Sequence, residues 1–263
     1  MRKLVTLPIA ISLLCLLPAT VQAQAPSWTG LYVGGTVGAR VTDADYRTTS
    51  IFALLPPPFT TTPDGTAARS FNETDFRFGA YAGAIWQFAP TWVIGAEMSI
   101  GTALDSSNPR IGIPGSPNAV PGFTANTIGD RLSVAGDWDA AIRARLGYLV
   151  SPATLLYVSG GVAFQDVVLR AQCGGNPAIN ACAVDNVETS RTLRTGWTVG
   201  GGIEQALGGN LFVRLDYAYA DFARFSHLFF RGSYNLAGPY DDQFTGRVDV
   251  STHTANLGLA YKF

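Results

Sequence analysis

The chain has 263 residues, of which 47% are hydrophobic, 14% are charged and 29 are glycines. Its formal net charge of −1 argues against a nucleic-acid partner, which would select a basic surface. A chain of this length suffices for one domain, especially a domain built from strands.

Residues 1–23 have the pattern of a secretory signal peptide. Two basic residues precede an apolar run over residues 4–17, which is shorter than the ~20 residues that a transmembrane helix needs. Small residues follow at candidate cleavage sites, so we expect cleavage after Ala23 or Ala25. Residues 24–263 would then form the exported protein.

Eight later segments alternate between apolar residues and polar or small ones, which is the pattern of a strand with two different faces. In chain order they cover residues 30–40, 76–86, 92–100, 138–148, 156–165, 197–204, 211–219 and 254–263. The apolar face carries no charged residue in any segment, and aromatic residues lie near both ends of the segments. Short connections alternate with long ones, and the long ones cover residues 41–73, 102–136, 169–193 and 223–250.

This arrangement favours a membrane-spanning barrel over a soluble one. A soluble barrel would bury the mixed charges of the second face and expose a band of valine, leucine and tryptophan. Transmembrane barrels have an apolar outer face, aromatic residues at both membrane interfaces, short turns at one end and long loops at the other. We therefore predict an all-β fold, an eight-stranded antiparallel transmembrane β-barrel with four long outer loops and short periplasmic turns.

The polar face of the predicted strands supplies an interior charge network. We expect barrel-interior ion pairs among Glu204, Arg214, Glu97, Arg143, Arg145 and Asp216. A tight turn sets Glu204 directly opposite Arg214, where Cβ atoms are ~5 Å apart. Glu97 and Arg143 form the second predicted pair, with Tyr81 opposite Glu97 as a hydrogen-bond donor. Because eight strands leave a lumen that side chains fill, we expect little conductance.

Two cysteines remain after the signal peptide, Cys173 and Cys182. They flank the sequence GGNPAINA, which is rich in turn-forming residues, and disulfides are common in exported proteins. We expect a Cys173–Cys182 disulfide that pins the third outer loop. The alternative is two free thiols.

The first and last predicted strands carry residues typical of a known family. The segment WTGLYVGG follows the signal peptide, and the chain ends in LGLAYKF with a terminal phenylalanine. Together with the eight alternating segments, these ends resemble the small outer-membrane β-barrel proteins. That family includes the OmpA transmembrane domain, OmpX and the outer-membrane immunogenic proteins of alphaproteobacteria. We expect a monomer in the outer membrane of a Gram-negative bacterium, in contact with outer-membrane lipid and lipopolysaccharide.

The resemblance also implies an assembly signal in the last strand, read by the barrel assembly machinery. Its residues would be Leu257, Leu259, Tyr261 and Phe263. The chain departs from OmpA in lacking a periplasmic peptidoglycan-binding domain, so a cell-wall tether is not expected.

These features predict a structural role in envelope integrity, with the outer loops as a surface for host or phage ligands. We expect no catalytic residue, cofactor or metal, since a phosphate-loop motif is absent and the loop carboxylates lack ligand spacing. Three alternatives stay open: a narrow passive pore, a haem-binding surface protein with His227 as ligand, and a lipid A-modifying enzyme. The enzyme would use Ser251 and His253, which share one face of the last strand.

Overall fold

The computed structural model describes residues 27–53, 59–61, 68–104, 110–111, 131–174, 185–231 and 243–263. The predicted signal peptide and Cys182 lie outside these residues, so the cleavage and the disulfide remain predictions. The described part of the chain holds no helix that is long and apolar enough to cross a membrane.

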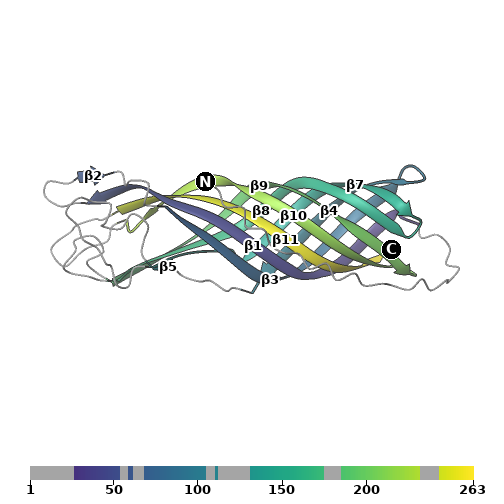
Figure 1. Cartoon of the computed structure of the whole chain (residues 1–263), viewed down its shortest axis with the longest axis horizontal. Coiled ribbons are helices and arrows are strands. Elements are labelled where there is room, and N and C mark those ends of the chain that lie inside the picture. Colours follow the sequence, from purple (N-terminus) through teal and green to yellow (C-terminus); the bar gives the residue numbers. More distant parts are fainter. Residues whose placement is uncertain are drawn as a thin grey trace.

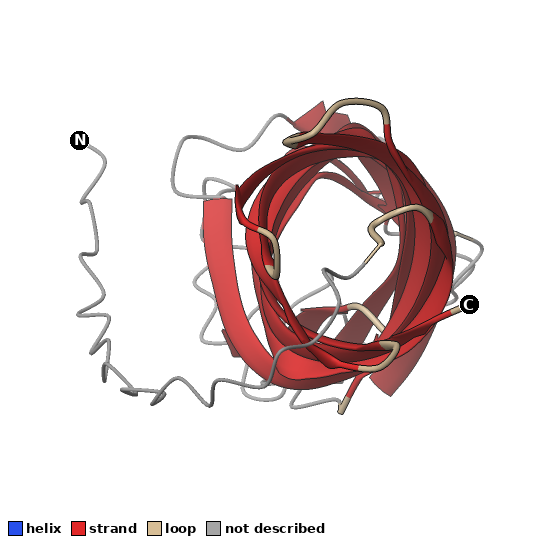
Figure 2. Cartoon of the chain, turned by 90° about the vertical axis from the view of Figure 1, so that its right-hand side faces the viewer, coloured by secondary structure: helices blue, strands red, loops and turns tan. Residues whose placement is uncertain are grey.

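The strands form an elongated barrel (Figure 1). The long strands are β1 (Gly30–Ala53), β3 (Ala68–Gln87), β4 (Trp92–Ala103), β7 (Trp138–Ser151), β8 (Thr154–Gly174), β9 (Asp185–Gly208), β10 (Leu211–Phe229) and β11 (Gln243–Lys262). Within the described residues each of these eight strands pairs antiparallel with the next, and β11 pairs with β1 to close the ring (Figure 2). Three short strands, β2 (Phe59–Thr61), β5 (Arg110–Ile111) and β6 (Arg131–Ala135), pair with β1, β6 and β8 respectively. The predicted all-β antiparallel barrel is confirmed.

Short connections join the strands at one end of the barrel, which we call the turn end. They are residues 88–91, 152–153 and 209–210, and the C-terminus lies at the same end (Figure 1). Gly208 and Gly209 have φ angles of 104° and 59°, which residues with a Cβ atom rarely adopt. These glycines therefore allow β10 to follow β9 directly. We call the opposite end the loop end.

The predicted extents of the long loops were wrong. Strand β1 continues to Ala53, β8 reaches Gly174, β9 begins at Asp185 and β10 ends at Phe229, so much of the predicted loop sequence is strand. The prediction stopped each strand where its apolar outer face ended. In the structure the strands continue beyond that level, but there the apolar residues lie on the inner face and the polar residues on the outer face. This is the reverse of the arrangement near the turn end, and we call it the exchange of faces.

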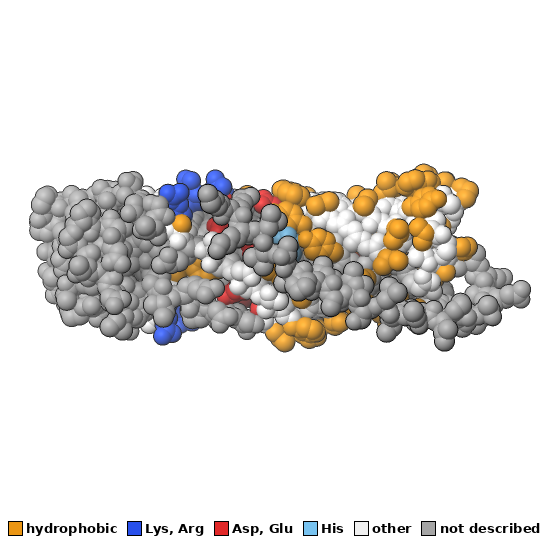
Figure 3. Space-filling view, in the orientation of Figure 1, with side chains coloured by type: hydrophobic (Ala, Val, Ile, Leu, Met, Phe, Trp, Pro, Cys, Tyr) orange, Lys and Arg blue, Asp and Glu red, His pale blue; other side chains and the backbone are white. Residues whose placement is uncertain are grey.

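The exchange of faces divides the barrel into two halves. In the turn half, apolar side chains such as Leu31 and Leu259 are exposed on the outside, and charged side chains such as Glu97 are buried inside. In the loop half, Asp45 is exposed on the outside and its neighbour Tyr46 is buried inside. The molecular surface follows this division, with hydrophobic side chains over the turn half and charged ones nearer the loop end (Figure 3). The loop half therefore has the pattern of a sheet in a water-soluble protein, with apolar side chains inside and polar side chains outside.

The interior of the loop half is an apolar core, which we call the loop-end core. Its members include Ala44, Tyr46, Phe71, Leu132, Val134, Val167, Leu169, Phe222, Phe225, Phe229, Phe230, Phe244, Val248 and Val250. At this level β6, β8 and β9 form one half-sheet, and β10, β11, β1 and β3 form the other. Backbone pairing between β9 and β10 ends at Gly196 and Phe222, so side chains rather than a continuous ladder join the two half-sheets there.

Candidate functional site

The barrel lumen is closed near the turn end by a buried apolar cluster, the turn-end core. Its residues are Trp28, Tyr32, Tyr81, Ile85, Val93, Leu149, Leu155, Phe212 and Ala260. Trp28 precedes β1 and is 1% exposed; its ring lies 5.1 Å from that of Phe212, and its Nε1 donates to Pro152 O at 3.0 Å. The residue before the first strand thus folds into the opening and packs there.

Above the turn-end core, one carboxylate is held by three arginines. Glu97 on β4 lies 2.9 Å from Arg143 Nη2, 3.1 Å from Arg145 Nη1 and 2.5 Å from Arg214 Nη1. The Tyr32 hydroxyl also donates to Glu97 Oε2, at 2.9 Å. Glu97 is 3% exposed. A buried carboxylate is stable only when its oxygen atoms are paired in this way.

Two further carboxylates complete this central charge layer. Arg145 Nη2 lies 2.5 Å from Glu204 Oε1, and Arg143 Nη1 lies 3.5 Å from Asp216 Oδ2. Asp216 also accepts a hydrogen bond from Asn256 Nδ2 at 3.1 Å. The layer therefore contains Glu97, Glu204 and Asp216 opposite Arg143, Arg145 and Arg214, and its formal charges cancel.

The structure brings the six predicted interior residues together, but the pairs differ in detail. Arg143 is directly opposite Glu97, and Arg214 is directly opposite Glu204, as the register arguments predicted. Arg214 nevertheless lies 3.8 Å from Glu204 and only 2.5 Å from Glu97, because its long side chain crosses the lumen. Arg145, which the sequence could not assign to a partner, takes Glu204.

The role predicted for Tyr81 was wrong. The register of β3 and β4 places Gly83, not Tyr81, opposite Glu97. Tyr32 on β1 instead supplies the hydroxyl to Glu97. The Tyr81 ring lies 3.5 Å from the Arg214 guanidinium carbon in a cation–π contact.

A second charge layer lies nearer the loop end. Arg77 Nη2 lies 2.5 Å from Asp139 Oδ1, and Arg40 Nη1 lies 3.2 Å from Asp139 Oδ2. Arg40 also lies 3.8 Å from Asp75. Asn256 joins the two layers, because it accepts from Arg77 Nη1 at 3.3 Å and donates to Asp216.

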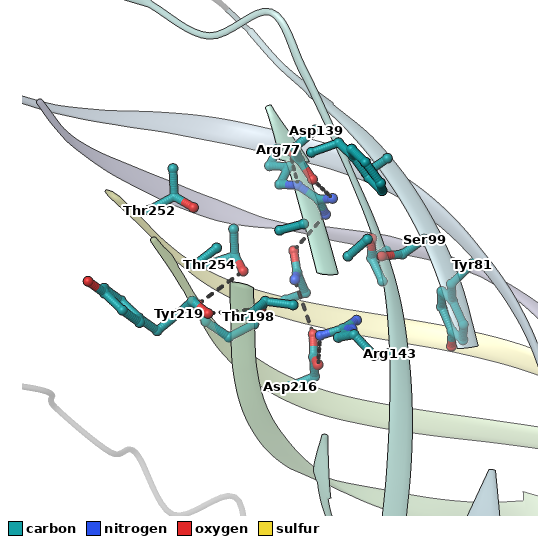
Figure 4. A pocket seen from close by; sticks show the side chains of 18 of the residues that line it. Arg77, Tyr81, Ser99, Asp139, Arg143, Thr198, Asp216, Tyr219, Thr252 and Thr254 are labelled. Carbon is teal, nitrogen blue, oxygen red and sulfur yellow. Dashed lines mark hydrogen bonds and ion pairs between the residues drawn. The ribbon is translucent and has the colours of Figure 1, made fainter. Parts of the chain in front are cut away.

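A cavity of about 50 Å³ lies between the two charge layers (Figure 4). Its lining includes Tyr81, Ser99, Asp139, Arg143 and Thr198. This space suits a few water molecules, since one water needs ~10–15 Å³ of such volume. The buried Tyr81 hydroxyl has no protein partner and is a natural ligand for such a water.

The two residues considered for enzyme chemistry, Ser251 and His253, have different neighbours in the structure. His253 is on the outer face of β11, where its Nδ1 lies 2.7 Å from the Tyr217 hydroxyl and its Nε2 lies 3.8 Å from Asp43. Ser251 stands across from Asp43 and Asp221 on the neighbouring strands. His253 is therefore engaged by Tyr217 rather than by Ser251.

The other candidate residue, His227, lies in the loop half beside residues that sequence reasoning missed. It contacts Glu188 and Ser190 on β9. No signal in the sequence marked these two residues, since they are nearly 40 positions away in a segment predicted to be loop.

Each residue of the predicted assembly signal faces outwards near the turn end. Leu257, Leu259, Tyr261 and Phe263 are all exposed, and the first three stand across from Val37, Gly35 and Val33 of β1. The Phe263 N–H donates to Leu31 O at 2.8 Å. Cys173 stands at the end of β8 across from Asn186.

Comparison with known proteins identifies the family. The family model described as "outer membrane protein beta-barrel domain" matches residues 11–263. The chain belongs to this family. The predicted recognition and the predicted location in the outer membrane of a Gram-negative bacterium are thereby confirmed.

Several relatives of the chain are outer-membrane immunogenic proteins. A 31 kDa outer-membrane immunogenic protein of Brucella melitensis is 26% identical over 94% of this chain and 88% of its own. A 25 kDa outer-membrane immunogenic protein of Brucella abortus is 24% identical over 94% of this chain and 84% of its own. Among solved structures, OprG from Pseudomonas aeruginosa has the same fold, with a TM-score of 0.52, 12% identity and coverage of 91% of this chain and 98% of its own. The apolar outer face of the turn half is accordingly the membrane-spanning surface of an outer-membrane barrel.

Proposed function

We propose that this outer-membrane protein acts as a closed barrel that stabilises the envelope and presents its loop end to surface partners. The observation that carries the proposal is the contact of Glu97 with three arginines inside the lumen. Arg143 and Arg145 come from β7, the strand next to β4, whereas Arg214 comes from β10 on the opposite side of the ring, so its ion pair with Glu97 bridges the lumen.

The layers above and below this network support the same conclusion. The turn-end core lies on one side of it, and the second charge layer and the loop-end core lie on the other. A solute that passed through the lumen would have to displace apolar side chains and break buried ion pairs, one level after another. The proposed partners are therefore met at the surface: outer-membrane lipid and lipopolysaccharide, the barrel assembly machinery during biogenesis, and host or phage ligands. We propose that the protein is a monomer.

Planar-bilayer recording tests the closed state. We expect the purified native protein to show no stable porin-sized conductance, because the lumen is filled at several levels. Deletion of the gene should increase sensitivity to detergents, and the native gene should restore resistance. A stable conductance from the native protein would contradict the closed barrel and favour the passive-pore alternative.

Surface labelling tests the orientation. We expect the loop end to face outside the cell and the turn end to face the periplasm, as in other barrels with short turns at one end. A cysteine placed at Arg224, which is exposed in the loop half, should react with an impermeant maleimide on intact cells. A cysteine placed at Asn210 should react only after the outer membrane is permeabilised. The opposite pattern would overturn the orientation.

The haem-binding alternative has a structural obstacle at its proposed ligand. Both ring nitrogens of His227 are engaged, Nε2 with Glu188 at 2.8 Å and Nδ1 with Ser190 at 3.4 Å. Haem ligation would have to displace one of these partners. A haem titration without a Soret shift would agree with the closed-barrel proposal.

A further inference from the structure

The two half-sheets of the loop half meet at an opening in the backbone ladder between β9 and β10. Pairing ends at Gly196 and Phe222, although β9 extends back to Asp185 and β10 extends to Phe229. A bulge between Phe222 and Phe225 redirects β10 at this point. We call the unpaired stretch, residues 185–195 of β9 facing residues 223–229 of β10, the seam.

Three polar side chains meet across the seam in the order hydroxyl, imidazole, carboxylate. His227 Nε2 lies 2.8 Å from Glu188 Oε1, and His227 Nδ1 lies 3.4 Å from Ser190 Oγ. The side chains of His227 and Glu188 are 25% and 30% exposed, so solvent reaches them. A ring with its proton on Nε2 donates to Glu188 and leaves the Nδ1 lone pair for the Ser190 hydroxyl.

The backbone beside these residues is strained. Phe230 has a φ of 61°, and among the described residues it is the one position other than glycine with a positive φ. Such a conformation is unfavourable for a residue with a Cβ atom and is concentrated at functional sites. Here it accompanies a hydrogen bond from the Phe230 N–H to Glu188 Oε2 at 2.5 Å, which fixes the carboxylate that contacts His227.

We propose that Ser190 and His227, positioned by Glu188, form a hydrolytic site for carboxylic esters with an apolar acyl group. Ser190 Oγ attacks the ester carbonyl carbon while His227 Nδ1 takes the hydroxyl proton. The carbon–oxygen bond to the alcohol then breaks, and the alcohol leaves with the proton from His227. A water molecule attacks the acyl-serine, again through His227, and releases the carboxylic acid and the free Ser190 hydroxyl.

The seam also supplies groups that such a reaction needs. Successive N–H groups of a strand point to alternate sides, so every second residue of β9 in the seam directs its N–H toward β10, where no backbone partner is paired with it. Unpaired backbone N–H groups are the usual donors to a carbonyl oxygen that becomes negative. The Phe229 ring lies 4.5 Å from that of His227, and Phe230 and Phe244 pack behind it in the buried core. This apolar neighbour of the imidazole is the reason for proposing an ester with an apolar acyl group.

The same contacts would also serve as a purely structural clasp between the half-sheets. A clasp needs the hydrogen bond between His227 and Glu188 but has no use for a nucleophile at Ser190. Covalent labelling of Ser190 and hydrolysis of an ester therefore distinguish the hydrolytic role from the structural one. The site is in the loop half, so its test is independent of whether the lumen conducts.

The purified full chain, folded in detergent, should hydrolyse p-nitrophenyl butyrate and should be labelled by a fluorophosphonate at Ser190, as located by peptide mass spectrometry. Ser190→Ala should abolish labelling and reduce hydrolysis by roughly 100-fold or more. The control Ser226→Ala removes an exposed hydroxyl next to His227 in the chain and should leave both unchanged. Heat-modifiable electrophoretic mobility should show that each variant is folded.

The role of Glu188 is tested by the pH profile. Glu188→Gln should lower kcat by roughly 10-fold or more and shift the profile of hydrolysis, and Glu188→Asp should restore part of the rate. Absence of a Ser190 adduct, or hydrolysis by Ser190→Ala at the native rate, would overturn the proposal in favour of the clasp. His227→Ala should also abolish hydrolysis. If that variant does not fold, the Ser190→Ala result still decides between the two roles, because that change removes only one hydroxyl.

Discussion

Replacing Glu97 by alanine is expected to lower the free energy of unfolding by about 3–5 kcal/mol, the usual cost of removing one partner from a buried ion pair. The change leaves Arg143, Arg145 and Arg214 facing one another with one carboxylate fewer. The excess positive charge should also admit water and anions, so the barrel should become leaky. Guanidinium unfolding in lipid vesicles, followed by tryptophan fluorescence, and planar-bilayer recording measure the two effects.

A matched exposed acid provides the control for Glu97. Asp249 pairs with Arg224 on the outside of the loop half, where both side chains are exposed. Asp249→Ala should therefore cost less than ~1 kcal/mol and leave conductance unchanged. The double variant Glu97→Ala/Arg214→Ala restores charge balance and should recover part of the stability. Equal losses for Glu97→Ala and Asp249→Ala would show that the central layer does not stabilise the barrel.

Replacing Phe244 by aspartate is expected to disrupt the loop half and spare the turn half. Phe244 is 1% exposed in the loop-end core, and loss of a buried phenylalanine alone costs about 3–5 kcal/mol. An unpaired carboxylate in this core adds a further penalty. Since the turn half has its own core and charge layers, its heat-modifiable mobility should persist while trypsin cleaves at Arg47 and Arg247.

The neighbouring residue separates burial from a general effect of charge. Thr245 is on the outer face of the same strand, so Thr245→Asp should leave trypsin resistance close to that of the native protein. Complete unfolding of the whole barrel by Phe244→Asp would contradict the division into two halves. Unchanged proteolysis would contradict the assignment of Phe244 to a core.

The turn half could be predicted from sequence because its chemistry follows a simple period. Every second residue is apolar and meets lipid, and the residues between them carry charges that meet in the lumen. The opposition of Glu97 with Arg143 follows from strand order and turn length, which the sequence contains. The ion pair of Glu97 with Arg214 does not follow from strand order and turn length, because it depends on how far a long side chain reaches across a closed ring.

The loop half escaped prediction for a different reason. Alternation continues there, but the apolar residues face inwards, so a criterion based on an outward apolar face no longer applies. Residues of the seam are also brought together by tertiary structure alone. Ser190 and His227 are on strands that share no backbone pairs at their level, and no local pattern connects them.

The exchange of faces fixes the depth at which the barrel sits in its bilayer. Asp43 and Asp221 are on the outer face just above the apolar surface of the turn half, at the level of Ser251. Sinking the barrel by two residues, roughly 5 Å along tilted strands that rise ~3.3 Å per residue, would carry these carboxylates into hydrocarbon. Lifting it by the same amount would expose apolar side chains to water at about 25 cal/mol per Å². Both displacements meet a restoring force, so the barrel holds its height without a separate anchor, and the seam stays at a constant distance above the membrane.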